Sequence, residues 1–245
     1  MSFETVLNAA REGDPDAQVA MGYLFYRGDG VGMDRREAAR WFGLAADQGN
    51  AEAMCNLGHM RAHGEGIRAD LDKAMELYRK SAELGYPPAM FNLGFMLTDV
   101  EGIEQDWAEG YEWYSKAAEA GNLIAAYRVA VMDEEGRGVP VNYAKAAEGY
   151  DLCLTHGYPK GGYRLGMMHL NGKGFPKNPD KASKYFSKAA DLGLDEAMLM
   201  LGKMSMSGEG MVLSLRNAEK WLKKAAGRGN AEAAELLTEI RKASR

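Results

Sequence analysis

Apolar residues recur along the chain with the spacing of helices, in short segments interrupted by glycines. Residues 50–85 contain two such segments, and Gly64 and Gly66 separate them. The apolar positions are Ala53, Met54 and Leu57 in the first segment and Leu71, Ala74, Met75, Leu77, Tyr78 and Ala82 in the second. Both sets follow the period of an α-helix, and Gly85 stands where a helix commonly ends. The pattern predicts two helices joined by a turn.

The same pattern returns every 36 residues. One series of glycines at this interval is Gly13, Gly49, Gly85, Gly121, Gly157, Gly193 and Gly229. A second is Gly30, Gly66, Gly102, Gly138, Gly174 and Gly210, and a third is Gly22, Gly58, Gly94, Gly166 and Gly202, with Ala130 in place of one member. A fixed period of this length is typical of a solenoid built from repeated helix pairs.

Polar residues mark where the second helix of each pair (helix B) begins. The residue before it has a short oxygen-bearing side chain in every repeat: Asp34, Asp70, Asp106, Asn142, Asn178 and Ser214. Such side chains accept hydrogen bonds from the free N–H groups of the first turn. Asp34 with Glu37, and Asp106 with Glu109, resemble a capping box. The first helix (helix A) follows a proline at Pro15, Pro87 and Pro159, in agreement with a helix start.

Small residues recur where the helices should touch. One position of helix B carries Ala38, Ala74, Gly110, Ala146, Ala182 and Ala218, and another carries Ala46, Ala82, Ala118, Leu154, Ala190 and Ala226. These residues allow close approach of neighbouring helices. Large side chains nearby are expected to fill the space between repeats: Trp41, Leu77, Trp113, Tyr185 and Trp221.

The predicted fold class is all-α: a right-handed α/α superhelical solenoid of six 36-residue helix-turn-helix repeats with capping helices at both ends. We expect a single repeat domain over residues 1–245. Its predicted parts are an N-terminal cap helix at 1–13, repeats at about 14–49, 50–85, 86–121, 122–157, 158–193 and 194–229, and a C-terminal cap helix at 230–245.

Composition narrows the possible partners. The net charge is −5 and the pI is near 5.5, and no basic run stands out apart from the tail RKASR. The charge therefore gives no support for a nucleic-acid or membrane partner. The first residues carry acids and lack the apolar core of a signal peptide, which indicates a cytoplasmic protein unless a leader was removed. Cys55 and Cys153 are expected to be core thiols, because two distant cysteines make no disulfide framework.

The motif in residues 57–85, LG followed by GEGI and then DLDKAMELYRKSAELG, resembles the Sel1-like repeat family, a relative of the tetratricopeptide repeat. Residues 21–49, 165–193 and 201–229 match it similarly, whereas Val100, Ala130 and Cys153 depart from it. The resemblance implies an adaptor or scaffold that binds other proteins. Some members of the family are immunity proteins against bacterial toxins, and a hydrolase has been suggested for others.

In tetratricopeptide-like stacks helix A lines the concave surface, so we expect its outward positions to bind the partner. These positions are rich in aromatic residues and methionine, which are common at interfaces. The candidate partner-binding residues are Tyr23, Tyr26, His59, His63, Phe91, Phe95, Tyr127, Arg128, Tyr163, Arg164 and Met167. Asn56 with Asn92, and Arg128 with Arg164, form rows that could bind a partner's backbone or carboxylates. A solvated polar strip is the alternative interpretation.

The spacing of His59 and His63 could suit a metal, but no third ligand lies nearby in sequence, so a partner contact is the favoured interpretation. No nucleophile motif or phosphate-binding loop is present, and the acid pair Glu134–Glu135 is expected to be solvated. We therefore expect no catalytic residue, no metal and no cofactor.

The sequence predicts a non-catalytic module that binds a peptide or a folded protein in its concave groove. We expect it to be a monomer alone or a heterocomplex with its partner. An immunity or inhibitor protein that neutralises a bacterial toxin is the first alternative. A hydrolase is the second.

Overall fold

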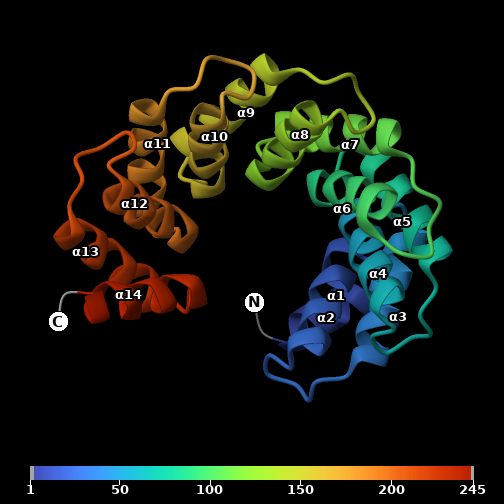
Figure 1. Cartoon of the computed structure of the whole chain (residues 1–245). Coiled ribbons are helices and arrows are strands. Elements are labelled where there is room, and N and C mark those ends of the chain that lie inside the picture. The colour runs from blue at the N-terminus through green and yellow to red at the C-terminus, as the bar shows by residue number, and fades with distance from the viewer. Residues whose placement is uncertain (1–2, 244–245) are drawn as a thin grey trace. The chain divides into compact units, whose positions relative to one another are not determined.

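The computed structural model describes residues 3–243, and this range contains fourteen α-helices and no β-strand (Figure 1). The first seven are α1 (Phe3–Glu12), α2 (Pro15–Arg27), α3 (Arg35–Asp47), α4 (Ala51–His63), α5 (Leu71–Glu83), α6 (Pro87–Asp99) and α7 (Trp107–Glu119). The last seven are α8 (Leu123–Glu135), α9 (Tyr143–Thr155), α10 (Pro159–Asn171), α11 (Pro179–Asp191), α12 (Asp195–Ser207), α13 (Leu215–Ala226) and α14 (Ala231–Ala243). The expected all-α fold of repeated helix pairs is confirmed.

Helices α2, α4, α6, α8, α10 and α12 are the A helices, and α3, α5, α7, α9, α11 and α13 are the B helices. The chain divides into two compact units, Met1–Asn122 and Leu123–Arg245, and each contains three repeats. No helix among residues 3–243 is long and apolar enough to cross a membrane.

The six predicted N-caps of the B helices are all formed. The capping oxygens accept hydrogen bonds of 2.9 to 3.2 Å from backbone N–H groups two or three residues later. The reciprocal half of the capping box is absent, and that part of the prediction is wrong. The N–H groups of Asp34 and Asp106 donate to the carbonyls of Phe25 and Leu97 in the preceding helix, so they are not free to bind Glu37 or Glu109.

The second glycine of the loop between helices A and B is required for stacking. Gly66 has φ +70°, in the left-handed region, and a side chain there would overlap the backbone of Arg35 at the start of the preceding B helix. Gly210 lies in the same way against Pro179. These two loops thus pack against the helix B of the preceding repeat.

Within each pair, helix A lies against a buried ring of helix B. A Cβ at Gly22 would lie 2.5 Å from the Phe42 ring, and one at Gly94 would lie 2.9 Å from the Tyr114 ring. The large residue in this contact is fully or almost fully buried in every repeat: Phe42, Tyr78, Tyr114, Tyr150, Phe186 and Leu222. The sequence analysis expected the preceding residue of each helix B to fill the space between repeats. Of these residues, Trp41 and Trp113 are buried, whereas Leu77, Tyr185 and Trp221 are half-buried.

In the fourth repeat the close contact between helices A and B is kept, but the glycine that allows it lies on helix B instead of helix A. Ala130 replaces the glycine of helix A, and its Cβ would lie 2.9 Å from a Cβ at position 149. Position 149 is glycine, whereas the other repeats have Trp41, Leu77, Trp113, Tyr185 or Trp221 there. The methyl group of Ala130 is therefore accommodated by Gly149, and close packing is retained.

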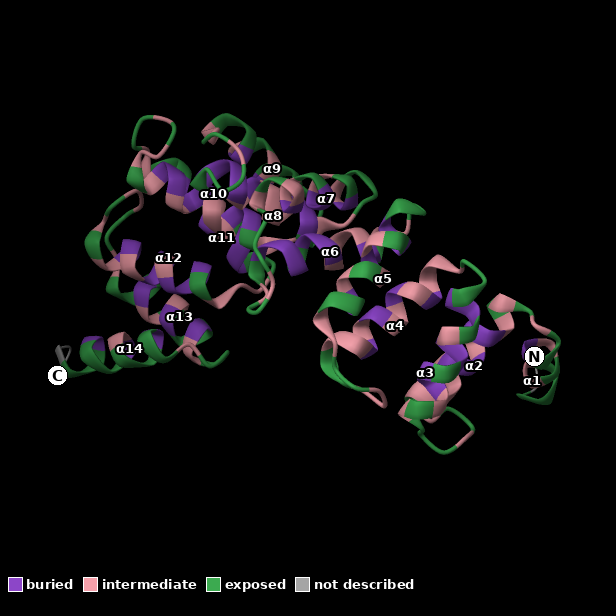
Figure 2. Ribbon diagram, turned by 90° about the vertical axis from the view of Figure 1, so that its right-hand side faces the viewer, coloured by how far each residue is buried: buried purple, intermediate pink, exposed green. Residues whose placement is uncertain are grey.

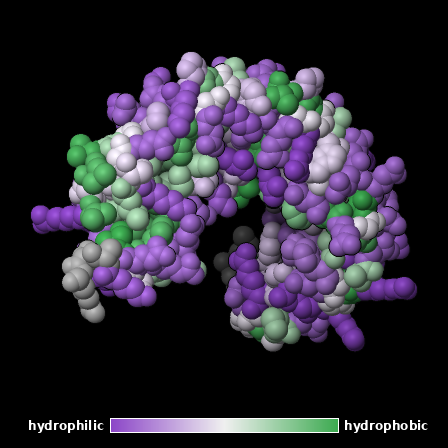
Figure 3. Space-filling view, in the orientation of Figure 1, coloured by the Kyte–Doolittle hydropathy of each residue, from purple (hydrophilic) through white to green (hydrophobic). Residues whose placement is uncertain are grey.

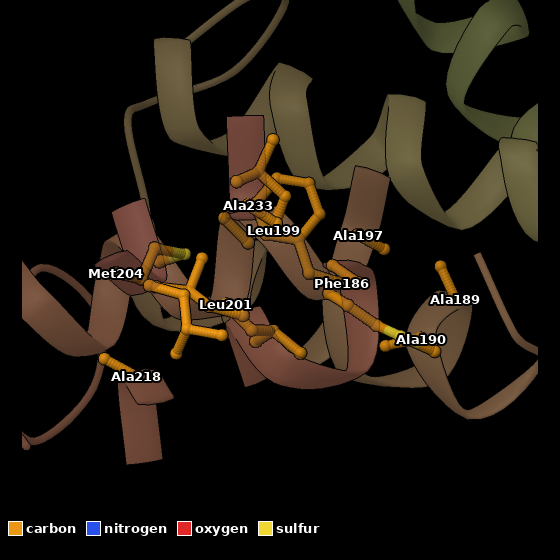
Figure 4. Close-up of a cluster of buried hydrophobic side chains, with 14 of the residues drawn as sticks. Phe186, Ala189, Ala190, Ala197, Leu199, Leu201, Met204, Ala218 and Ala233 are labelled. Atoms are coloured by element: carbon orange, nitrogen blue, oxygen red, sulfur yellow. The ribbon is translucent and has the colours of Figure 1, made fainter. Parts of the chain in front are cut away.

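Buried residues lie on the sides of the helices that face their neighbours (Figure 2). In the C-terminal unit the largest cluster extends from α11 to α14, with Phe186, Leu199, Leu201 and Met204 at its centre (Figure 4). Helix α14 adds Ala233, Leu237 and Ile240 to this cluster. In the N-terminal unit, α1 contributes Ala10, whose carbonyl accepts a 3.1 Å hydrogen bond from the Gln18 side chain. Helix α1 thus covers the first repeat and α14 covers the sixth.

Candidate protein-binding surface

None of the eleven candidate partner-binding residues is buried. Phe95 and His63 are exposed, and the other nine are half-buried. Six lie on α2, α4 and α6 of the N-terminal unit, and five lie on α8 and α10 of the C-terminal unit. Their role in binding stays a prediction, but the structure determines what each side chain contacts.

In the N-terminal unit, the A-helix surface contains a pocket of about 380 Å³, which we name the N-terminal pocket. Residues of the first three repeats line it. Its lining residues are Tyr23, Tyr26, Phe42, Cys55, Asn56, His59, Met60, Tyr86, Pro88 and Asn92. Three predicted residues, Tyr23, Tyr26 and His59, therefore converge on one cavity.

Tyr23 is fixed in this pocket by two neighbours on α4. Its hydroxyl donates to Glu52 Oε1 at 2.8 Å and accepts from Asn56 Nδ2 at 2.9 Å. Asn56 Nδ2 also donates to the Glu52 carbonyl at 3.0 Å. Burial, together with the Glu52 carboxylate, raises the pKa of Tyr23 against the lowering effect of Asn56. The phenol therefore stays protonated and holds one orientation.

The rim of the N-terminal pocket is held by a charged cluster that links repeats 1 and 2. The Tyr26 hydroxyl donates to Glu65 Oε2 at 2.7 Å, and Arg35 Nη1 pairs with the same oxygen at 2.7 Å. The Arg35 guanidinium also lies 3.7 Å from the centre of the Tyr26 ring. This cluster orients Tyr26 before any partner binds.

The floor of the pocket is uncharged. Burial raises the pKa of the Cys55 thiol to about 12 and that of Tyr86 to about 12. Asn92 Nδ2 lies 3.6 Å from Cys55 Sγ, a weak hydrogen bond. Within residues 3–243, neither Asn56 Oδ1 nor Asn92 Oδ1 accepts a hydrogen bond. The pocket thus presents two amide oxygens to a ligand with N–H donors.

The two histidines lie together on α4. The rings of His59 and His63 are 4.2 Å apart, and His63 Nδ1 lies 2.9 Å from the His59 carbonyl oxygen. Burial, then the neighbouring His63, lowers the pKa of His59, so its neutral form is favoured. No group of three or more His, Cys, Asp or Glu residues in the described range is arranged to hold a metal. His63 does not line the pocket.

Phe91 and Phe95 lie on α6, outside the lining of the N-terminal pocket. The Phe91 ring packs 5.6 Å from the buried Tyr114 ring, and Phe95 is 39% exposed. Among the candidate phenylalanines and tyrosines, Phe95 therefore has the largest exposed fraction.

In the C-terminal unit, Tyr127 and Arg164 belong to a network around Glu134. The expectation that Glu134 is solvated is wrong, because its side chain is only 6% exposed. Glu134 accepts a 2.6 Å hydrogen bond from the Tyr150 hydroxyl, and its carboxylate lies 2.9 Å from Lys173 Nζ and 3.5 Å from Arg164 Nη1. Arg164 Nε also donates to the Tyr127 hydroxyl at 3.3 Å. A partner carboxylate would have to compete with Glu134 for Arg164.

The remaining candidates of this unit are half-buried. The Tyr163 ring lies 5.8 Å from the ring of Phe186, and Met167 packs at the margin of the C-terminal core. Arg128, the residue after Tyr127, is half-buried as well. Their exposed portions are smaller than that of Phe95.

Sequence reasoning missed Tyr86, which lines the N-terminal pocket although it precedes its helix. Tyr158 has the equivalent place two repeats later, and its ring lies 5.4 Å from that of Tyr127. Both tyrosines stand directly before the proline that opens helix A, at Pro87 and Pro159. This Tyr-Pro pair was the signal that could have found them.

Repeated helix pairs, with a pocket on the surface of their first helices, define a helix-pair solenoid protein. The family model described as Sel1 repeat matches residues 15–50, 51–86, 87–122, 123–148, 161–194 and 195–230. The chain belongs to the Sel1 repeat family, whose members are protein-interaction modules and generally act as non-catalytic scaffolds. The incomplete fourth match coincides with the repeat that contains Ala130 and the Glu134 network.

Solved structures of other proteins have the same fold. A protective antigen of uropathogenic Escherichia coli with an SLR fold is 29% identical, with a TM-score of 0.87 over 96% of this chain and 50% of that chain. The present chain thus spans half the length of that antigen. A Sel1 repeat protein from Oxalobacter formigenes is also 29% identical, with a TM-score of 0.74 over 88% of this chain and 89% of that one.

A more distant match is an immunity protein from Pseudomonas aeruginosa, 19% identical, with a TM-score of 0.49 over 87% of this chain and 81% of that chain. This likeness is too weak to carry an argument about function. No curated protein sequence matches the chain.

Proposed function

We propose that this chain is a non-catalytic binding module whose N-terminal pocket holds an extended segment of a partner protein. The partner's backbone would donate N–H groups to Asn56 and Asn92, and an apolar side chain would pack against Tyr23, Tyr26 and Tyr86. We place the protein in the cytoplasm, as a monomer when alone and a heterocomplex when its partner is present.

The arrangement of Asn56 and Asn92 carries this proposal. The two residues are 36 positions apart, line one pocket and have side-chain oxygens that accept no hydrogen bond from residues 3–243. An amide oxygen that accepts no hydrogen bond within the protein can accept one from an N–H group of a ligand in the pocket. Tyr23 and Tyr26 are already oriented by their own hydrogen bonds, so little side-chain entropy is lost when a partner binds.

Affinity capture with a quantified readout tests the proposal. The wild-type chain and the double variant Asn56→Ala with Asn92→Ala are immobilised, and the proteins retained from native lysate are compared by mass spectrometry. We expect at least one protein to be recovered by the wild type and lost with the double variant. The dissociation constant of that protein is then measured directly, and a rise of about tenfold or more is expected from two lost hydrogen bonds.

The matched control is Thr155→Ala with Asn217→Ala, which removes two polar side chains that are exposed on B helices. The control should recover the same proteins as the wild type and keep the wild-type melting temperature. The pocket variant should melt slightly lower, because Asn56→Ala also removes the 2.9 Å hydrogen bond to the Tyr23 hydroxyl. Equal recovery by the pocket variant and the wild type would contradict the proposal.

The same experiment distinguishes an adaptor from an immunity protein. An immunity protein would retain one cognate partner very tightly and protect cells that express it. An adaptor would retain several partners with moderate affinity. A hydrolase would instead show turnover abolished by the change of one polar residue.

A further inference from the structure

The net charge of the whole chain conceals a strongly basic region. Residues 158–229, the fifth and sixth repeats, contain 13 Lys and Arg and 6 Asp and Glu, for a formal net charge of +7. The whole chain carries −5, so the remaining residues carry −12. Salt screens charges beyond about 10 Å, so a partner at the surface of these repeats is affected mainly by their local charge.

The cations lie on the outward sides of two B helices. Helix α11 has Lys181, Lys184 and Lys188, and α13 has Arg216, Lys220, Lys223 and Lys224; all seven are exposed, and we name them the basic face. In α13 they lie opposite the buried Ala218, Leu222 and Ala225. Their spacing of three and four residues places each set on one side of its helix.

The two helices lie side by side, so the two sets form one surface. At one end, Lys177 before α11 pairs with Glu209 before α13 at 2.8 Å. At the other end, a Cβ at Gly193 after α11 would lie 3.0 Å from the guanidinium of Arg228 after α13.

The basic face is not neutralised by the chain itself. None of its seven side chains pairs with a carboxylate among residues 3–243. Glu219 on α13 is paired with Arg241 at 3.1 Å, and Asp180 and Asp191 are the two acids on α11. Like charges repeated along a helix are destabilising in the isolated protein. An anionic partner would remove that repulsion.

An exposed apolar loop borders the basic face. Between α12 and α13, Val212 is 84% exposed, Leu213 is 61% exposed and, at the first position of α13, Leu215 is 50% exposed; these three residues are the apolar loop. Hydrophobic atoms gather over this part of the chain at the left of the view in Figure 3. Exposure of neighbouring aliphatic side chains reduces solubility unless something covers them.

Half-buried aromatic rings lie beneath two of the lysines. Lys188 Nζ is 5.8 Å from the centre of the Tyr185 ring, and Lys224 Nζ is 4.6 Å from the centre of the Trp221 ring. Tyrosine and tryptophan with one apolar and one polar side are common at the boundary between a bilayer and water. The surface thus combines cations, aliphatic side chains and amphipathic rings.

We propose that the basic face and the apolar loop bind the surface of an anionic phospholipid bilayer. Six of the seven cations are lysines, which act as mobile point charges suited to a layer of headgroups, whereas bidentate recognition of a protein carboxylate favours arginine. The apolar loop would enter the boundary between the headgroups and the acyl chains. This inference departs from the sequence prediction of no membrane partner, which rested on the net charge of the whole chain.

Sedimentation with vesicles tests the proposal on the full chain. The probe is phosphatidylcholine vesicles with about one third phosphatidylserine, at low ionic strength, compared with pure phosphatidylcholine. We expect the wild type to bind only the anionic vesicles and to dissociate as salt is raised. Each lysine near the surface contributes about fivefold, so Lys184→Gln with Lys220→Gln and Lys223→Gln should lower partitioning roughly a hundredfold. Val212→Ser with Leu213→Ser should also weaken binding.

The controls use exposed cations on the B helices and one exposed loop residue of the N-terminal unit. Arg36→Gln with Lys73→Gln and Lys80→Gln removes the same charge from B helices, and Met33→Ser changes the loop position equivalent to Leu213. These variants should bind vesicles like the wild type. The proposal is overturned if the wild type does not bind anionic vesicles, or if the controls lose as much binding as the basic-face variants. It is also overturned if the basic face instead binds an acidic polypeptide such as polyglutamate, or drives salt-sensitive self-association in sedimentation velocity.

Discussion

Glu134 should contribute several kcal/mol to the stability of the C-terminal unit, although its neighbour Glu135 should contribute almost nothing. Glu134 accepts a hydrogen bond from the buried Tyr150 hydroxyl and pairs with Lys173 and Arg164. Glu135 is an exposed residue whose side chain is 28% exposed, and it pairs with Arg137 at 2.9 Å and Arg164 at 3.8 Å. The two adjacent acids therefore form a matched pair for substitution by alanine.

The magnitude follows from the three partners of Glu134. Loss of the carboxylate leaves the Tyr150 hydroxyl buried without an acceptor, which costs about 1–3 kcal/mol. The side chains of Arg164 and Lys173 are 33% and 41% exposed and can turn to water, so each pair contributes only about 0.2–1 kcal/mol. Glu134→Ala should therefore reduce the free energy of unfolding by about 3 kcal/mol, which corresponds to a fall in melting temperature of about 6–12 °C for a chain of this size.

Urea and thermal unfolding, followed by helical circular dichroism, measure the effect. Glu135→Ala should cost less than about 1 kcal/mol, as is typical of exposed ion pairs. In a Tyr150→Phe background, Glu134→Ala should cost about 1–2 kcal/mol less, because the hydroxyl that it leaves unpaired is already gone. Equal and small effects of Glu134→Ala and Glu135→Ala would refute the reasoning, since they would place both carboxylates in water.

Three further predictions concern packing and burial. Gly22→Ala should destabilise the N-terminal unit by about 1–2 kcal/mol in urea unfolding, because the new methyl group overlaps the buried Phe42 ring. Gly43→Ala, in the same unit but with open space around it, should stabilise it by about 0.5–1 kcal/mol. The opposite order of stabilities would contradict the packing. Gly149→Ala should destabilise the C-terminal unit by about 1–3 kcal/mol, and adding Ala130→Gly should recover much of that loss in a double-mutant cycle. An absence of coupling energy between the two substitutions would show that the two positions do not meet. Burial raises the pKa of Cys55 from 9.0 to about 12 and that of Cys153 from 9.0 to about 11, so both thiols should resist a thiol-specific reagent at mildly alkaline pH until the chain is unfolded. Because both folded-state pKa values are raised, the associated stability is present below pH 9 and should be lost as the pH rises from 9 to 12. Rapid labelling of the native protein would contradict this assignment.

Features set by local chemistry could be predicted from the sequence. The N-cap of a helix depends on one side chain and the backbone within three residues of it, so Asp70 and Asn178 were sufficient to predict two helix starts. The glycine period was equally informative, because Gly66 must adopt a positive φ and leave room for the preceding repeat. These signals determine the order and length of the helices.

The direction of each side chain was harder to predict. Neighbouring residues on a helix point about 100° apart, and Trp41 and Phe42 are both large and apolar, so periodicity alone could not decide which one meets Gly22. Glu134 presented the same difficulty, since adjacent acids on one helix can have opposite environments. Tyr86 was missed because it lies outside any helix, where helical periodicity gives no information.

The structure also explains how one chain can combine an acidic and a basic region. Contacts within and between repeats use the buried rings, the small helix positions and the loop glycines, and these are retained at 36-residue intervals. The outward positions of the B helices take no part in those contacts, so Lys184 and Lys220 stand where repeat 4 has Glu148. Stability in a repeat array is carried mainly by contacts between adjacent repeats. Substitutions on the basic face should therefore leave the N-terminal pocket intact, and binding at the two surfaces can be measured separately.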